Sequence, residues 1–595
     1  MNFNKHLKRF LKWRLRHVSH KKLIMILSVL VGFLTGLVAV VIKYLVHFIK
    51  YLLTSGFVKE YENFLYFFYP AIGITLAIIF VRYIIRHHVE HGIPSVLYAI
   101  STTRGKIKRH NLFSSIITSA FTVGFGGSVG LEGPTVATGA AYGSNLGRLF
   151  HLNYKQLILL LGAASAGAMA AIFKAPITAV VFAVEVIMID LTVTSIVPLI
   201  LASLSASLTS ILFLGVDVIY KFEVKDKFIF ADIPYFILLG IIAGFVAVYF
   251  TRTYMFVNNK FEKINNIWIR IGIGGMILGI LIFLFPSLYG EGYEAINMAL
   301  NGNFEHLYNH SIFFEYKDNF YIILILFAVT LLFKVIATAT TFGAGGVGGI
   351  FAPSLFLGSN LGLGFAMFIN HFGSNFGLKT LSLSNFAFVG MAGLIAGNLH
   401  APLTAIFLIA EITGGYELFM PLMIVSIVSF LTVKLFQTNS VYTIQLAARG
   451  ELMTHHQDKN ILKMMNIEKL VEKNFIPVNI DNSLGDLVKV VSVSSRNIFP
   501  VIDDDNHFMG VVLLDDVRNI MFKPELYENT YVHDFMVVPS TKVDIHDSMH
   551  DVADKFHKTG MYNLPVLNNG KYLGFVSRAN VFSSYRRKLK HFSED

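Results

Sequence analysis

Cysteine is absent from this 595-residue sequence, and charged residues are scarce. Without cysteine the chain has no disulfides, no thiolate metal sites and no cysteine nucleophile. Charged residues make up 15% of the chain and hydrophobic residues 54%, whereas a soluble domain carries about a quarter charged residues. The scarcity of charge predicts that most of the chain lies in a lipid bilayer.

Several apolar runs approach the roughly 20 residues that span the hydrocarbon core of a bilayer. They cover residues 23–49, 66–85, 234–250, 269–285, 321–337 and 419–436. The first run does not have the form of a cleaved signal peptide, because it is long, follows a basic leader and lacks a small-residue cleavage site. We expect a multi-pass membrane domain over residues 23–450.

Acidic residues are missing from residues 1–22, which contain eight lysines and arginines. A basic segment directly before a spanning helix marks the cytoplasmic side of the membrane. No aromatic or base-reading pattern accompanies the charge, so we do not expect nucleic acid as a partner. We therefore expect a protein of the cell membrane whose N-terminal segment, residues 1–22, is cytoplasmic.

From Gly450 onward polar residues interrupt every apolar run, and a unit of sequence repeats. The stretch from Phe499 to Asp516 matches the stretch from Leu564 to Asn580. Each copy predicts a short strand, a turn, a second strand and a helix. An amphipathic helix is expected before each copy, at Leu484–Val493 and Met549–Thr559.

This repeat resembles a tandem pair of CBS domains, at residues 466–521 and 532–588, after a linker at 451–465. Such pairs often bind adenine nucleotides, with the ribose held by a hydroxyl residue and an acid near the final helix. The first unit keeps the acid, Asp516, and the second keeps the hydroxyl, Ser577. Neither unit carries both groups, so a nucleotide site and a packing and dimerisation module remain alternatives.

The membrane part is also repeated. Ala175-Pro-Ile-Thr-Ala, which leads to Glu185, matches Ala401-Pro-Leu-Thr-Ala, which leads to Glu411. In each copy a proline stands where a helix can begin at no cost in hydrogen bonding. Two halves with Gly/Pro-interrupted hydrophobic segments at matching places predict a transporter-type repeat with its site between the halves.

Three Gly/Pro turns predict helices that begin part-way across the membrane. They read His91-Gly-Ile-Pro, Gly130-Leu-Glu-Gly-Pro and Gly348-Gly-Ile-Phe-Ala-Pro. A helix start leaves about four N–H groups unpaired and presents about +0.5 charge. Glycine lets these groups approach a bound ion closely. Three such starts would form an anion site without Arg or Lys, whose full charge would hold an anion too tightly for exit.

These motifs together resemble the CLC family of chloride channels and chloride/proton exchangers, over about residues 20–450. The family fold is a dimer in which each subunit has its own anion pathway between two inverted halves of short tilted helices. The resemblance implies an all-α multi-pass membrane domain of two inverted repeats, followed by a cytoplasmic α/β tandem CBS domain.

The resemblance also assigns roles to residues. Glu132 matches the gating glutamate, which competes with the anion for the outer site and moves away when it is protonated. A carboxylate in hydrocarbon costs several kcal/mol unless it faces a partner or a water-filled route. The family role accounts for the carboxylate of Glu132, because it takes the place of the transported anion at the outer site. The anion-binding positions, most of them backbone amides, are His91, Gly92, Ile93, Leu131, Gly133, Ile350, Phe351 and Tyr442.

Two positions depart from the family pattern. His91 stands where the family usually has serine, which puts selectivity among chloride, nitrate and fluoride in question. Val186 stands at the inner proton-relay position, where proton-coupled members commonly have glutamate. The preceding Glu185, like Glu411, is expected to make structural bonds at a helix end. The Glu-Val pair favours a voltage-gated type of chloride channel, and a proton-coupled chloride antiporter is the alternative.

Other classes of protein fit the sequence less well. A CBS-regulated cation transporter should show carboxylate ligands along its spans, and a membrane sensor that presents the CBS pair needs no anion-type helix starts. No nucleophile set, metal cluster or P-loop indicates an enzyme. We expect chloride as the transported ligand and no metal. Membrane lipid and a second copy of the chain are the expected partners, and an adenine nucleotide at the CBS pair is a further candidate ligand.

Overall fold

The computed structural model describes residues 17–54, 62–87, 92–189, 193–215, 228–300, 319–373, 380–414, 416–448, 462 and 465–593. By internal contacts the chain divides into two compact units, Met1–Leu452 and Met453–Asp595.

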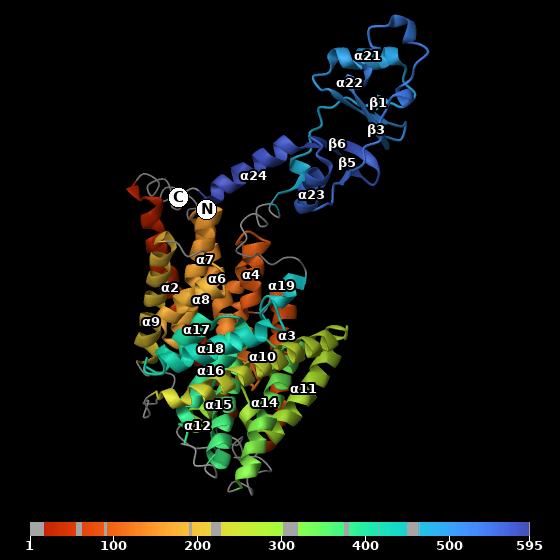
Figure 1. Ribbon diagram of the computed structural model, residues 1–595. Helices are drawn as coiled ribbons and strands as arrows, with labels where there is room; N and C mark the ends of the chain where they lie inside the picture. Colours follow the sequence, from red (N-terminus) through yellow and green to blue (C-terminus); the bar gives the residue numbers. More distant parts are fainter. Residues whose placement is uncertain are drawn as a thin grey trace. The chain divides into compact units, whose positions relative to one another are not determined.

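The first unit is a bundle of α-helices of very different lengths (Figure 1). Its helices are α2 (His20–Thr54), α3 (Glu62–Ile79), α4 (Gly92–Ser101), α5 (Ser114–Gly124), α6 (Glu132–Leu149), α7 (Tyr154–Phe173), α8 (Pro176–Glu185), α9 (Val193–Leu214), α10 (Ile233–Glu262), α11 (Ile267–Leu284), α12 (Tyr293–Leu300), α14 (Phe320–Gly343), α15 (Phe351–Gly373), α16 (Leu383–Leu399), α17 (Pro402–Ile412), α18 (Phe419–Lys434) and α19 (Ile444–Ala448). A π-helix (Phe80–Ile85) continues α3, and short 3-10 turns lie at Arg109–Leu112, Phe230–Asp232 and Pro286–Leu288.

Within the described residues, eight helices are long and apolar enough to cross a membrane. Helices α2, α3, α10, α11 and α14 confirm five of the expected apolar runs. The sixth run, at 419–436, is only the 16-residue helix α18, so the expectation of a full-length span there was wrong. Helices α7, α9 and α15 add three spans. Their small and polar residues hide them from a search for apolar runs, and most of α7 and α15 is buried against other helices of the bundle.

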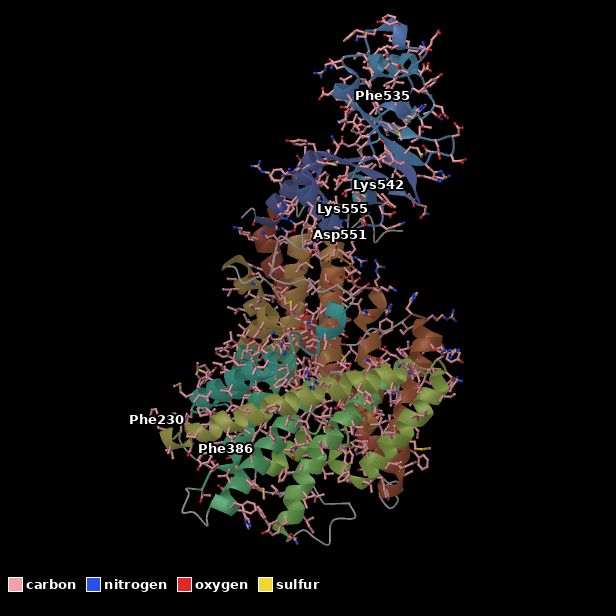
Figure 2. The ribbon with its side chains drawn as sticks, turned by 45° about the vertical axis from the view of Figure 1, so that its right-hand side comes forward. Phe230, Phe386, Phe535, Lys542, Asp551 and Lys555 are labelled. Atoms are coloured by element: carbon pink, nitrogen blue, oxygen red, sulfur yellow. The ribbon has the colours of Figure 1, made fainter. Side chains whose placement is uncertain are left out.

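Glycine allows the inner helices to approach one another closely. A side chain at Gly362 on α15 would lie 1.9 Å from the carbonyl oxygen of Phe386 on α16. A side chain at Gly143 on α6 would lie 2.7 Å from the carbonyl oxygen of Leu160 on α7. Lipid offers no hydrophobic drive between helices, so close van der Waals contact of this kind holds a membrane bundle together. Phe386, labelled in Figure 2, also stacks on Phe236 of α10 with ring centroids 4.8 Å apart.

The two halves of the first unit share a local backbone form. Helix α7 is followed by Lys174 and helix α16 by His400, and both residues have φ of 55°. Left-handed backbone is uncommon for residues other than glycine. In both halves the next helix then begins with a proline at its first position, Pro176 in α8 and Pro402 in α17. The repeat expected from the sequence is therefore also a repeat of structure.

The second unit contains two three-stranded sheets of the same topology. The first consists of β1 (Val478–Asn479), β2 (Ile498–Ile502) and β3 (Phe508–Leu513), with helices α21 (Leu484–Val493) and α22 (Leu514–Val517). The second consists of β4 (Val543–Asp544), β5 (Asn563–Asn568) and β6 (Lys571–Ser577), with helices α23 (Met549–Thr559) and α24 (Arg578–Ser593). In each sheet the first pair of strands is parallel and the second antiparallel. Helices α21 and α23 have the bounds expected from the sequence.

The two sheets share part of their core. Phe475, Phe508, Val511, Leu567 and Phe575 form one buried cluster to which both repeats contribute. The ends of the elements are fixed by polar contacts. For example, Lys555 on α23 donates from Nζ to the carbonyl oxygen of Lys542 at 2.9 Å, close to the start of β4 (Figure 2).

Candidate functional site

The three Gly/Pro turns are helix starts, as the sequence predicted. Helix α4 begins at Gly92, α6 at Glu132 and α15 at Phe351. The turns before α6 and α15 pair with each other: the N–H of Gly130 donates to the carbonyl oxygen of Gly349 at 2.8 Å, and the reverse bond is 2.7 Å. A side chain at Gly349 would lie 2.8 Å from the backbone nitrogen of Gly133. Only glycine permits this approach, which brings two positive helix ends together.

A cavity of about 40 Å³ lies where these helix starts meet. It is lined by Gly92, Ile93, Pro94, Gly133, Tyr254, Phe342, Gly348, Gly349, Ile350, Val441 and Tyr442. A cavity needs about 10–15 Å³ to hold a water molecule, so there is room for a small ion. The lining contains no charged side chain, and the N-terminal turns of three helices meet there, which suits an anion.

The structure brings five of the eight expected anion-binding residues to this cavity. They are Gly92, Ile93, Gly133, Ile350 and Tyr442. Leu131 and Phe351 are buried beside it and are not among its lining residues. His91 lies outside the described residues.

Tyr442 presents an unsatisfied polar group. Its side chain is 5% exposed, and its hydroxyl has no hydrogen-bond partner among the described residues. A buried polar atom left without a partner costs about 1–3 kcal/mol, so such atoms in native structures call for a ligand, water or ion. The position of this hydroxyl at the cavity supplies a donor for an anion.

Glu132 is fully buried at the first position of α6. One oxygen of its carboxylate accepts a hydrogen bond from the hydroxyl of Tyr293. The other oxygen is buried without a hydrogen-bond partner in the described part of the chain. This oxygen lies close to the turn before α15, because a side chain at Gly349 would be 3.5 Å from it. A negative group thus lies at the helix ends that would attract an anion.

Sequence reasoning missed several of these residues. Tyr293 lies 161 positions from Glu132, and Tyr254 reaches the cavity from the middle of a long apolar helix. Neither tyrosine belongs to a Gly/Pro motif. No local pattern distinguishes them from the chain's other tyrosines, so nothing in the sequence could have found them.

Val186 and Glu185 end helix α8. Val186 is its C-cap residue and is 5% exposed. The carboxylate of Glu185 accepts hydrogen bonds from the N–H and the hydroxyl of Thr404, both at 2.7 Å. Thr404 lies in the first turn of α17. These bonds at a helix end confirm the structural role expected for Glu185.

In the second unit, the two candidate nucleotide residues have different surroundings. Asp516 is exposed on α22. The hydroxyl of Ser577 donates to one carboxylate oxygen of Glu472 at 2.5 Å, and Arg496 donates to the other at 2.7 Å. No sequence motif indicates Glu472, which accepts the hydrogen bond of the hydroxyl that a ribose would need.

Two protein-family profiles match this chain. The family profile described as "Voltage gated chloride channel" matches residues 72–434, and the profile described as "CBS domain" matches residues 467–523 and 532–587. The chain belongs to the CLC family. It carries two C-terminal CBS domains, and it is a multi-pass membrane protein of anion transport and not an enzyme.

Relatives and solved structures agree with membership of the CLC family. The H(+)/Cl(-) exchange transporter ClcA of Vibrio cholerae is 28% identical over 433 residues, which are 71% of this chain and 88% of the relative. The structure of a slow cyanobacterial Cl-/H+ antiporter covers 73% of this chain and 98% of its own, at 21% identity and a TM-score of 0.60. The structure of a eukaryotic CLC transporter covers 94% of this chain and 99% of its own, at 17% identity and a TM-score of 0.59. The CLC-like fold expected from the sequence is thereby confirmed.

Proposed function

We propose that this CLC protein is a chloride channel that conducts chloride, or a similar small anion, through a glutamate-gated pathway. The cavity at the starts of α4, α6 and α15 carries the proposal, because amide donors and the Tyr442 hydroxyl converge there without a full positive charge. Such a site attracts an anion and still releases it. By analogy with its family, the protein would work as a homodimer with one pathway in each subunit.

In this proposal Glu132 is the gate. Its carboxylate is a negative group at the N-terminus of α6, where an anion would also be stabilised. Anion and carboxylate therefore compete for neighbouring donors. When the carboxylate is protonated it loses its attraction to the helix end, so it moves away and the outer position becomes free.

Val186 supports passive conduction. Coupled exchange needs a route for protons from the inner side, and valine cannot carry a proton. The neighbouring Glu185 is already engaged in bonds to α17. We infer that protons do not cross the protein in step with anions.

Proton-coupled exchange is the second candidate function. The Vibrio cholerae relative is named as an H(+)/Cl(-) exchange transporter, and Tyr293 gives Glu132 a hydroxyl partner through which a proton could pass.

The reversal potential of the purified protein in liposomes, under opposed chloride and proton gradients, distinguishes the two functions. A channel reverses at the chloride equilibrium potential with little proton uptake. Proton movement driven uphill by a chloride gradient, and abolished by Glu132→Gln, would establish the exchanger. Absence of any anion flux from the wild-type protein would contradict both functions.

Residue 91 offers a test of selectivity. The family usually has serine at this position, and a histidine N–H can also donate to an anion. We propose that His91 contacts the central anion. His91→Ser should then change the relative fluxes of chloride, nitrate and fluoride, or the dependence of flux on internal pH. Unchanged selectivity and pH dependence in a folded variant would assign His91 a position away from the pathway.

We infer that the basic residues 1–22 face the cytoplasm. The CBS pair, at residues 466–521 and 532–588, would then lie on the same side, joined to the transport domain by residues 451–465. Protease added to one side of sealed vesicles tests this orientation, because it should cleave the N-terminal segment and the CBS pair together or leave both intact.

A further inference from the structure

An asparagine near the end of α16 is bonded to two of the segments that form the cavity. Asn398 is 1% exposed, and its Nδ2 donates to the hydroxyl oxygen of Ser354 on α15 at 2.8 Å. Its backbone carbonyl oxygen accepts from the N–H of Val441 at 3.2 Å. Val441 lines the cavity, and so does Tyr442, the next residue. Asn398 therefore joins the start of α15 to the segment that carries the Tyr442 hydroxyl.

Ser354 extends this contact to the cavity itself. Its hydroxyl donates to the carbonyl oxygen of Ile350 at 2.9 Å, and its backbone N–H donates to the same oxygen at 3.0 Å. Ile350 is one of the residues that line the cavity. A hydroxyl has one proton to donate and two lone pairs with which to accept, so Ser354 accepts from Asn398 and donates to Ile350 at the same time. The three residues form an unbroken chain of hydrogen bonds.

The chain of hydrogen bonds ends on the first peptide group of α15. The carbonyl of Ile350 and the N–H of Phe351 belong to one peptide group, and Phe351 is the first residue of the helix. The first four N–H groups of a helix have no acceptor within it, so this N–H is one of the donors that the helix start offers to an anion. Hydrogen bonds in a chain polarise one another, by about 10–30% per bond. The bonds that Ile350 accepts therefore make the Phe351 N–H a stronger donor.

The packing of α15 on α16 keeps the bond between Ser354 and Asn398 in place. One helical turn beyond Ser354, a side chain at Gly358 would overlap the backbone of Met391, and a side chain at Gly390 would overlap the backbone of Gly358. The two helices are thus in direct backbone contact. Ser354 and Asn398 are both buried, which excludes solvent from the bond between them. A polar bond between helices in such surroundings specifies their relative position.

We propose that Asn398 is a positioning residue of the anion site, which orients and strengthens the amide donor at the start of α15 through the hydroxyl of Ser354. The inference rests on the proposed anion pathway and adds to it a residue that does not line the cavity. Loss of the Asn398 amide removes the first bond of the chain, so Ser354 becomes a weaker donor to Ile350. The anion then loses affinity although no group that contacts it has changed.

Chloride titration calorimetry on the purified full-length protein tests this inference. Asn398→Leu keeps the approximate size of the side chain but cannot donate, so chloride affinity should fall by about three- to tenfold, the loss expected for one hydrogen bond. Asn360→Leu is the matched control. Asn360 is also 1% exposed, but its Nδ2 donates at 2.8 Å to the carbonyl oxygen of Phe356 in its own helix. Its chloride affinity should equal that of the wild type, whatever the change in its melting temperature.

A double-mutant cycle separates the chain of hydrogen bonds from loosened packing. Ser354→Ala removes the middle of the chain, so it should also lower chloride affinity. Because Asn398 acts through Ser354 in this inference, Asn398→Leu should cause no further loss of affinity in the Ser354→Ala background. Equal losses from Asn398→Leu in both backgrounds would mean that it only loosens the packing of α16, and the inference is then wrong.

Melting temperatures accompany each titration, to show that the variants are folded. If Asn398→Leu does not fold, Asn398→Ala takes its place in the cycle, because a smaller side chain causes no clash. Wild-type chloride affinity in folded Asn398 variants overturns the inference and leaves the proposed function standing. Absence of chloride binding by the wild-type protein would instead contradict the proposed function, and this inference with it.

Discussion

The carboxylate of Glu411 caps the helix that ends with Glu185, and the carboxylate of Glu185 caps the helix that carries Glu411. Glu411 accepts from the N–H of Thr178 at 2.7 Å and from that of the preceding residue at 3.0 Å. Glu185 accepts from the N–H of Thr404 at 2.7 Å and from that of the preceding residue at 3.1 Å. Each of the helices α8 and α17 therefore supplies a carboxylate that accepts from the N-terminal N–H groups of the other, so the two halves of the repeat cap each other.

This reciprocity makes Glu411 a matched control for Glu185. Each carboxylate accepts charge-assisted bonds worth about 1.5–3 kcal/mol, so Glu185→Gln and Glu411→Gln should lower the melting temperature by similar amounts. Anion flux per folded protein should stay near the wild-type value in both. Should Glu185→Gln alone remove proton movement in liposomes, Glu185 would be a proton carrier and its structural role would be secondary.

The gate can be tested from both sides of its hydrogen bond. Glu132→Gln and Glu132→Ala remove the competing charge, so anion flux at neutral pH should rise and its activation by acid should flatten. Tyr293→Phe removes the partner that holds the carboxylate, so flux should rise less than in the Glu132 variants. Liposome efflux measures all three.

Tyr289→Phe is the control for Tyr293→Phe. Tyr289 lies in the same segment, but its hydroxyl donates to a carbonyl oxygen away from Glu132. Its flux at a given pH should match that of the wild type. Unchanged flux and acid response in Glu132→Ala would show that Glu132 is not the gate.

The Tyr442 hydroxyl should contribute to chloride binding and not to the stability of the fold. Because it has no hydrogen-bond partner among the residues that the structure describes, Tyr442→Phe removes a buried unsatisfied group, and the melting temperature should stay constant or rise. Chloride affinity should fall, since the cavity loses a donor. Tyr249→Phe, whose hydroxyl donates to the carbonyl oxygen of Leu332 at 3.0 Å, should leave affinity unchanged. Equal chloride affinity in Tyr442→Phe and wild type would remove Tyr442 from the site.

Nucleotide binding by the CBS pair should be weak, because Glu472 already accepts the hydroxyl bond of Ser577. Glu472→Ala frees this hydroxyl and removes a negative charge, so ATP affinity should increase. Calorimetry with ATP on both proteins measures the difference. Sub-micromolar affinity in the wild type would contradict this expectation.

Truncation near residue 455 should leave a protein that still binds chloride.

The helix caps of the CBS pair depend on pH. Ser548 caps α23, and its hydroxyl donates to the carboxylate of Asp551 at 2.6 Å, which holds the pKa of Asp551 below its ordinary value. Because the folded pKa is the lower one, the stabilisation is present above the ordinary pKa and is lost as pH falls through the folded pKa.

Ser548→Ala should therefore speed hydrogen exchange of amides 549–559 several-fold at pH 7. After correction for intrinsic exchange rates, the difference in exchange rate between Ser548→Ala and the wild type should become smaller in acid, where Asp551 is protonated. Ser492→Ala, in α21 and outside the α23 cap, is the control. A difference that stays constant with pH would mean that Asp551 takes no part in the cap.

The helix starts at the candidate site could be predicted because their signals are local. The Gly/Pro turns before α6 and α15, and the prolines that open α8 and α17, act on the residues beside them. The span expected at 419–436 failed for a physical reason. A hydropathy search assumes an upright helix in lipid, whereas Pro421, Leu422 and Val425 of α18 are buried. Partners inside the bundle, and not membrane thickness, set the length of such a helix.

By itself the sequence determined the membrane setting, the two repeats, the three helix starts and the place of Glu132. These follow from composition and from short-range backbone chemistry. Only the tertiary structure decided that Tyr293 donates a hydrogen bond to Glu132 and that Ser577 donates one to Glu472. The partners are far apart in the chain, 161 residues in the first case and 105 in the last. No local pattern encodes such pairs, because they form only where packing brings distant polar groups together and burial requires each of them to find a partner.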